Sequence, residues 1–193
     1  DYALFMALKD ANGGQAWSNW DKSLRLREKK AMEEATETYS EEIRFYKMLQ
    51  YLFYQQWNAL KTYANEAGIE IIGDVPIYVA GDSADVWANP DQFYLDENLE
   101  PIEVAGCPPD AFSDDGQLWG NPLYRWGYHK ETVYQWWISR LAYVFRLYDV
   151  VRIDHFRGFD EYFSIPYGAE TAVDGHWEKG PGMDLFWKVR EAL

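Results

Sequence analysis

The chain has 193 residues, of which 48% are hydrophobic and 26% charged, and this composition predicts a folded globular protein while excluding intrinsic disorder, collagen and low-complexity sequence. Acidic residues outnumber basic ones by 32 to 18, and the formal net charge of −14 argues against nucleic acid or an anionic membrane as a partner. No apolar run approaches the about 18–20 residues that a membrane span needs. Cys107 is the single cysteine, which excludes an intrachain disulfide and fits a cytoplasmic protein.

Helices are expected over the first third of the chain. Residues 24–37 are charged and helical in character. From residue 43 to residue 64, apolar side chains recur every three or four positions, which predicts an amphipathic helix of about 27 residues. Gly68 stands where a glycine commonly ends such a helix. We therefore assign residues 1–68 to a helical subdomain.

Two buried strands are expected in the remainder of the chain, residues 69–193. The first begins with the apolar run 69–72 and continues to Pro76. The second covers residues 150–153 and ends at Asp154. Continuous apolar runs of this length are typical of strands that are covered on both faces.

A long irregular region and a helix separate these two strands. Residues 80–128 are rich in Asp, Asn, Gly and Pro but also in aromatic side chains, so we expect an ordered and functional loop. The pattern over 132–148 is helical, and a last helix is expected after residues 181–182. A strand, a loop, a helix and a second strand in this order predict a parallel pair of strands. The expected fold is therefore α/β, and a partial (β/α)8 barrel with inserted helical and long-loop subdomains fits best.

The motifs of several other chemistries are absent. The sequence contains no Gly-rich phosphate-binding loop, no HExxH zinc motif and no CxxC pair, and residues 110–116 lack the spacing of a calcium loop. Residues 81–83 faintly resemble an esterase nucleophile segment, although a helix N-cap is the simpler interpretation. His129 and His176 lack partners at metal-ligand spacing, so both are expected on the surface. Trp187 falls on a predicted helix face and is expected in the core.

Two acidic side chains stand at the ends of the predicted strands. Asp74 follows the run 69–72, and Asp154 closes the run 150–153. In parallel α/β barrels the carboxyl ends of the strands form the active face. Aromatic rings stack on the apolar faces of sugars, and carboxylates bind sugar hydroxyls. Carboxylates at strand ends in an aromatic-rich, acidic chain therefore indicate an uncharged sugar as the ligand.

Arg152 precedes Asp154 by two positions, so in a strand both side chains lie on the same face. The guanidinium is therefore expected beside the Asp154 carboxylate, where it would keep that group ionised. A glycosidic nucleophile needs the ionised form, because only a carboxylate attacks an anomeric carbon. The same spacing is also typical of an ordinary structural ion pair.

A resemblance to a known enzyme family rests on three strings. Residues 151–159, VRIDHFRGF, resemble the nucleophile strand of the amylomaltases, the 4-alpha-glucanotransferases of glycoside hydrolase family 77. Residues 72–87 resemble an earlier barrel strand of that family, and residues 106–122 resemble its long active-site loop. The resemblance implies a (β/α)8 barrel that transfers α-1,4-glucan segments between malto-oligosaccharides, without a metal or another cofactor.

The same resemblance implies roles for individual residues. Asp154 would be the catalytic nucleophile that forms the covalent glycosyl-enzyme intermediate. Arg152 would steady Asp154 and the sugar bound there, and Asp74 would bind hydroxyls near the same subsite. Trp119 and Phe112 would belong to the loop that covers the substrate.

His155 is a further substrate-binding candidate by resemblance, because it lies in the nucleophile motif. In a regular strand, however, neighbouring side chains point to opposite faces, so His155 is expected to point away from Asp154. At Ala111 some family members carry an aromatic residue, so one stacking contact is expected to be missing here.

A retaining glycosidase mechanism requires a second carboxyl group, and the resemblance places that glutamate downstream of Leu193. The chain is therefore expected to be a central barrel segment that is inactive alone. Because its strand edges would be open, we expect the isolated chain to self-associate. Two alternatives remain for the whole protein, a hydrolase of the same clan and a non-catalytic glucan-binding protein. Retention of Asp154 and Arg152 argues against the second.

Overall fold

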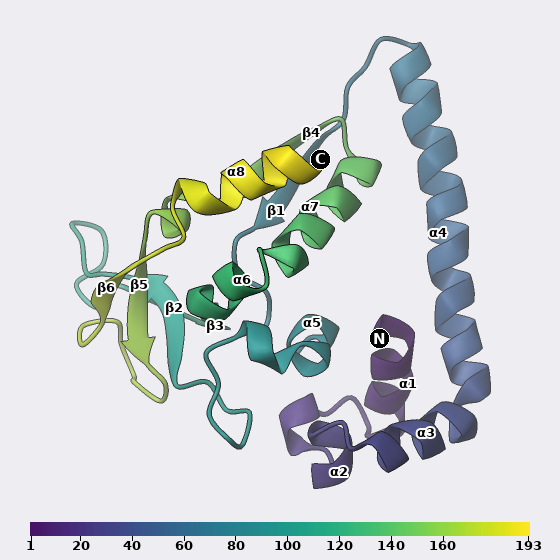
Figure 1. Ribbon diagram of the computed structural model, residues 1–193, viewed down its shortest axis with the longest axis horizontal. Coiled ribbons are helices and arrows are strands. Elements are labelled where there is room, and N and C mark those ends of the chain that lie inside the picture. Colours follow the sequence, from purple (N-terminus) through teal and green to yellow (C-terminus); the bar gives the residue numbers. More distant parts are fainter. The chain divides into compact units, whose positions relative to one another are not determined.

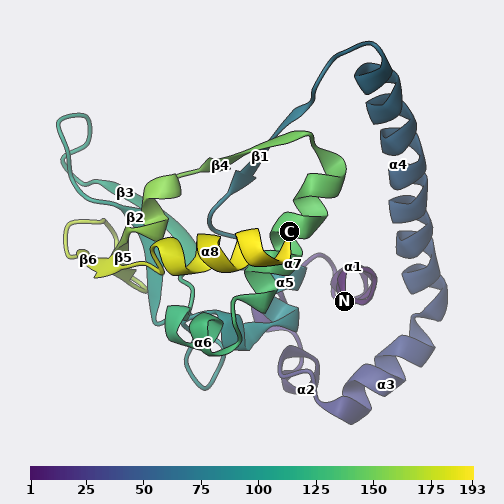
Figure 2. The same ribbon diagram turned by 45° about the horizontal axis from the view of Figure 1, so that its top comes forward.

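The computed structural model describes all 193 residues, which divide into two compact units (Figures 1 and 2). Unit 1 consists of Asp1–Gly68 and Asp82–Pro90, and unit 2 of Ile69–Gly81 and Asp91–Leu193. Unit 1 is helical, and unit 2 carries all the strands. Residues 82–90, which were assigned above to the second part of the chain, group with the helices. No helix combines the length and the apolar character that crossing a bilayer would require.

Unit 1 is built from five α-helices and a short 3₁₀ turn, η1. They are α1 (Tyr2–Ala11), η1 (Trp17–Asn19), α2 (Lys22–Arg25), α3 (Lys29–Thr38), α4 (Ser40–Glu66) and α5 (Ala84–Ala88). The centre of the unit is aromatic, because the rings of Phe5, Trp20 and Trp87 lie 5.4–5.7 Å from one another. The indole of Trp87 also donates a hydrogen bond to the carbonyl of Leu24. The side chain of Ser83 accepts from the backbone N–H of Val86 and caps α5.

Helix α4 has the 27 residues that the periodicity predicts, and Gly68 follows it with a φ of +75°. Its apolar stripe is not buried, however. Only Ile43, near the beginning of the helix, is fully buried, and it packs with α1. The side chains farther along the stripe, among them Phe53 and Leu60, are exposed because no element of unit 1 covers them.

Unit 2 contains a two-stranded parallel sheet formed by β1 (Ile72–Pro76) and β4 (Val150–Asp154). The parallel pairing predicted from the order of elements is confirmed. The predicted burial of both strands is wrong, since every second residue of each is exposed and Ile72 is 70% exposed. Helix α7 (Gln135–Leu147) packs against both strands, and a two-stranded sheet leaves both outer edges uncovered.

A second sheet of unit 2 was not predicted. It has four antiparallel strands in the order β3-β2-β5-β6, with β2 (Glu103–Cys107), β3 (Gln117–Pro122), β5 (Glu161–Pro166) and β6 (His176–Lys179). Region 80–128, predicted to be an ordered loop, is indeed ordered and supplies the β2–β3 hairpin. Neither sheet closes into a barrel.

The remaining elements of unit 2 are helical. They are α6 (Trp126–Glu131), α7, the 3₁₀ turn η3 (Phe156–Phe159) and α8 (Met183–Ala192). A further 3₁₀ turn, η2 (Pro90–Gln92), begins at the last residue that belongs to unit 1. Helix α7 begins three residues later than predicted, because Val133 and Tyr134 both have a positive φ. The helix predicted after residues 181–182 is confirmed as α8.

Two burial predictions fail in unit 2. His129 is fully buried, with one ring nitrogen 3.0 Å from the carbonyl of Gln92 and the aromatic rings of Tyr124 and Trp126 around it. Trp187 is 52% exposed on α8. His176 is exposed, as predicted.

Candidate active site

The two parallel strands end side by side, and their ends carry the candidate nucleophile. In the register of the pair, Asp74 lies opposite Arg152, and Pro76 lies opposite Asp154. Residues two positions apart in a strand point to the same face. Asp154 therefore projects from the same face as the Asp74–Arg152 pair, about 7 Å farther along the strand.

Arg152 forms an ion pair with Asp74 across the two strands. Its Nε donates to Oδ1 of Asp74 over 3.1 Å, and its Nη2 donates to Oδ2. This bidentate contact holds the pKa of the Asp74 carboxyl below its usual range, mainly through the hydrogen bonds from Arg152. The guanidinium thus binds Asp74, whereas the spacing in the sequence predicts that it lies beside Asp154. The strand register explains this pairing, because it places Asp74 directly opposite Arg152 and neighbouring strands lie only about 4.8 Å apart.

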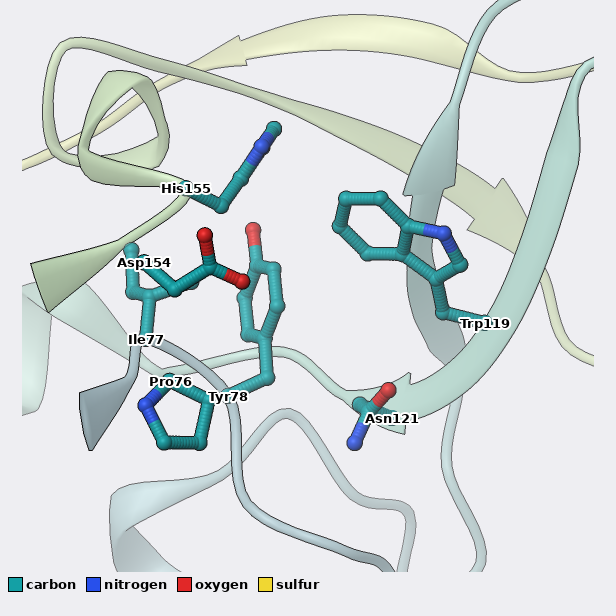
Figure 3. Close-up of a pocket in the computed structure, with 7 residues that line it drawn as sticks. All are labelled: Pro76, Ile77, Tyr78, Trp119, Asn121, Asp154 and His155. Carbon is teal, nitrogen blue, oxygen red and sulfur yellow. The ribbon is translucent and has the colours of Figure 1, made fainter. Parts of the chain in front are cut away.

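A pocket of about 150 Å³ opens beside Asp154 (Figure 3). It is lined by Pro76, Ile77, Tyr78, Trp119, Asn121, Asp154 and His155. The Asp154 carboxylate and the Tyr78 hydroxyl point into a common space, and the indole of Trp119 stands across from them (Figure 3). A carboxylate beside aromatic rings suits a sugar ring, whose apolar face stacks and whose edge forms hydrogen bonds.

His155 lines the same pocket as Asp154, although a continuous strand would separate them. The strand ends at Asp154, and His155 has a φ of +51°, which turns the chain into η3. Left-handed backbone at a residue other than glycine is uncommon and is often found at functional sites. The expectation that His155 points away from Asp154 is therefore wrong.

The ring of His155 is held by its aromatic neighbours. Its centroid lies 4.8 Å from the Trp119 ring, with the two planes at 89°, and 6.3 Å from the Tyr78 ring. Burial lowers the pKa of His155, so the ring is neutral near pH 7. Its Nε2 is buried without a hydrogen-bond partner.

Tyr78 and Asn121 line the pocket but were not among the predicted site residues. Burial raises the pKa of Tyr78, so its hydroxyl remains a hydrogen-bond donor. Asn121 donates from Nδ2 to the carbonyl of Val79 over 2.9 Å, which leaves its side-chain oxygen for another partner. Both residues belong to the strings 72–87 and 106–122, so the signal that could have identified them was present in the sequence.

A helix residue supports the floor of the pocket. Arg140 of α7 donates to the carbonyls of Pro76 and Ile77 over 2.7 and 2.9 Å. The hydroxyl of Tyr124 donates to the same Ile77 carbonyl over 2.6 Å. These bonds satisfy the backbone acceptors where β1 ends and fix the segment that faces Asp154.

Phe112 lies apart from the pocket. It sits in the turn of the β2–β3 hairpin, where Asp110 accepts hydrogen bonds from the backbone N–H groups of Phe112 and Ser113, and its ring is 98% exposed. Asp74 and Arg152 also stand outside the pocket lining. Of the predicted site residues, the structure thus brings together Asp154, His155 and Trp119.

The pocket contains one carboxylate, that of Asp154. A retaining double displacement uses two carboxyl groups about 5–5.5 Å apart. No group of three or more His, Cys, Asp and Glu side chains in the 193 residues is arranged to hold a metal ion. The geometry therefore supplies one carboxylate beside aromatic rings, which is a single member of the pair of carboxyl groups that such a reaction uses.

Comparisons with known proteins show which family this chain is similar to. The family model described as 4-alpha-glucanotransferase, glycoside hydrolase family 77, matches residues 1–193. The 4-alpha-glucanotransferases of Clostridium butyricum and Thermus thermophilus are 52% and 54% identical over the whole chain. The chain spans about two fifths of the length of these relatives, 40% and 39%.

A solved structure shows the same fold. The structure of amylomaltase from Streptococcus agalactiae in complex with acarbose matches with a TM-score of 0.96 and 48% identity, covering all of this chain and 39% of that one. The chain belongs to the 4-alpha-glucanotransferase family, glycoside hydrolase family 77.

Proposed function

We propose that the full-length protein containing this chain is a 4-alpha-glucanotransferase that moves α-1,4-glucan segments between malto-oligosaccharides. The single observation that carries the proposal is the placement of Asp154, at the end of a parallel strand and inside a pocket walled by Trp119, Tyr78 and His155, in a chain of this family. The parallel β1–β4 pair then forms part of a (β/α)8 barrel whose other strands lie outside this chain.

In the proposed reaction, the Asp154 carboxylate attacks the anomeric carbon of the donor glucan. The bond from that carbon to the glycosidic oxygen breaks, and the oxygen takes a proton from a carboxylic acid contributed by the rest of the protein. A hydroxyl of the acceptor glucan then attacks the same carbon and gives its proton back to that group. The ester bond to Asp154 breaks, and the two inversions together retain the α configuration.

The other residues position the substrate in this proposal. Trp119 presents an indole to a sugar ring, and the side chains of His155 and Tyr78, which line the same pocket, bind sugar hydroxyls. The Asp74–Arg152 pair lies on the same strand face as Asp154, two residues earlier in β4, and limits where the sugar at Asp154 can bind. Phe112, on the exposed hairpin turn, covers the acceptor side when a glucan is bound.

The test is to supply the full-length protein with maltotriose alone and to separate the products by length. Glucose together with a ladder of longer malto-oligosaccharides is expected. Glucose and maltose with nothing longer would show that water intercepts the intermediate, and would replace the transferase by a hydrolase.

Asp154→Asn is expected to abolish transfer, and Asp174→Asn, an exposed acid in the β5–β6 connection, serves as the matched control. Transfer by the Asp154→Asn protein would contradict the assignment of the nucleophile. The 193-residue chain by itself is expected to be inactive on maltotriose, because its pocket holds a single carboxylate.

A further inference from the structure

Unit 2 contains a second and larger cavity, of about 440 Å³, which the proposed mechanism does not use. The connection from β3 to α6 forms one of its walls, with Leu123, Tyr124 and Arg125 in its lining. Tyr124 stacks on Tyr78 with the ring centroids 6.1 Å apart, and Tyr78 lines the Asp154 pocket. The two stacked rings therefore separate the second cavity from the pocket that holds Asp154.

Besides Tyr124, three aromatic side chains from different parts of unit 2 line this cavity. Tyr94 precedes β2, Trp126 begins α6 and Tyr162 belongs to β5. Tyr94 is 43% exposed, so its ring is accessible to a ligand. The volume lies within the about 300–1,000 Å³ that is usual for small-molecule sites.

The charged side chains of the lining balance one another. Glu103 and Glu178 are acidic, and Arg125 and Lys179 are basic. Lys179 already donates to Glu161 over 2.6 Å, outside the cavity lining. The cavity thus has no surplus of positive charge for a phosphate or a carboxylate ligand, and an uncharged ligand with many hydroxyls suits it best.

Hydrogen-bonding capacity remains on these groups. Glu103 accepts one bond, from the Ser164 hydroxyl over 2.7 Å, and a carboxylate can accept several. The β5–β6 register places Tyr162 opposite Glu178. Burial, together with the negative charges of Glu178 and Glu103, raises the pKa of Tyr162 to about 12, so its hydroxyl stays a donor. Donors, acceptors and ring faces are thus all present in one cavity.

We propose that this cavity is an auxiliary carbohydrate site that binds one or two glucosyl units of an α-1,4-glucan, separately from the Asp154 pocket. The choice of glucan rests on the proposed function, whereas the preference for an uncharged polyhydroxylated ligand rests on the cavity itself. A long glucan held there increases the local concentration of its chain ends near the catalytic pocket, and short substrates gain nothing from it.

The experiment uses the full-length protein with Asp154→Asn, so that bound glucan is not turned over, and titrates it calorimetrically with maltoheptaose. Two binding sites per chain are expected. Adding Tyr94→Ala is expected to weaken one of them about tenfold, through the loss of a stacking ring. Tyr167→Ala, at an exposed tyrosine outside the cavity, is the matched control and leaves both sites intact. Glu178→Gln, which preserves the shape of the side chain, provides a second variant if Tyr94→Ala folds poorly.

A single site that neither cavity variant affects would overturn the inference. A parallel assay of wild-type transfer from maltotriose distinguishes this failure from a failure of the proposed function. If the wild type transfers glucan but the titration shows only one binding site, the auxiliary site is rejected and the proposed function stands. If the wild type does not transfer glucan but the titration shows a second site that Tyr94→Ala weakens, the auxiliary site is supported and the transferase is rejected. In an active protein, Tyr94→Ala is expected to raise the KM for amylose and to leave that for maltotriose unchanged.

Discussion

His129 makes the stability of the fold dependent on pH in a way that can be measured. The ring is fully buried, one nitrogen lies 3.0 Å from the Gln92 carbonyl, and Nδ1 is buried with no partner. Protonation at Nδ1 would place a charged donor among aromatic rings without an acceptor. Burial accordingly lowers the pKa of His129 from 6.5 to about 4.

The direction of the pH dependence follows from the linkage between proton binding and folding. Because the pKa is lower in the folded protein than in the unfolded one, the stabilisation is fully present above pH 6.5 and is lost as the pH falls from 6.5 toward 4. Each pH unit in this window removes about 1.4 kcal/mol, so about 2 kcal/mol disappears between pH 6.5 and pH 5, and about 3 kcal/mol over the whole window.

The measurement is urea unfolding of the full-length wild type and of His129→Gln between pH 8 and pH 5. Glutamine does not titrate in this range, so the variant lacks this source of pH dependence. On acidification from pH 8 to pH 5, the free energy of unfolding of the wild type is therefore expected to fall by about 2 kcal/mol more than that of His129→Gln. His176→Gln, at an exposed histidine, should keep the steep pH dependence of the wild type. Parallel pH profiles for wild type and His129→Gln would refute the reasoning.

Three further outcomes are expected. Trp119→Ala removes the ring packed at 4.8 Å against His155 and should raise the KM for maltotriose about tenfold in transfer kinetics. Arg152→Lys cannot form the bidentate contact with Asp74, so kcat should fall while the melting temperature barely changes, because the pair is exposed. Ser83→Ala removes the N-cap of α5 and should cost about 1 kcal/mol in urea unfolding, whereas Ser83→Thr should recover most of it.

The site combines two kinds of contact that differ in sequence range. The Asp74–Arg152 pair joins residues 78 positions apart through the β1–β4 register. Arg140 joins α7 to Ile77, the residue that follows β1, across 63 positions. Such contacts depend on how the strands and helices align, whereas the turn at His155 is set by the backbone of one residue next to Asp154.

The sequence by itself determined the local features and the family. Helical periodicity predicts the 27 residues of α4. The apolar run 150–153 predicts β4, the strand predicted from residue 69 to Pro76 overlaps β1 only from Ile72 onward, and the order of elements predicts the parallel pairing of the two strands. Asp154 was identified as the nucleophile candidate from its place at a strand end and from the motif around it. These signals are short-range, so they can be read from neighbouring residues.

The tertiary structure alone decided which groups meet. It paired Arg152 with Asp74, turned His155 into the Asp154 pocket, added Tyr78 to its wall and buried His129. It also folded the long aromatic region into an antiparallel sheet. Strand register and side-chain packing depend on contacts between distant segments, and their free energy is not encoded in any local pattern of residues.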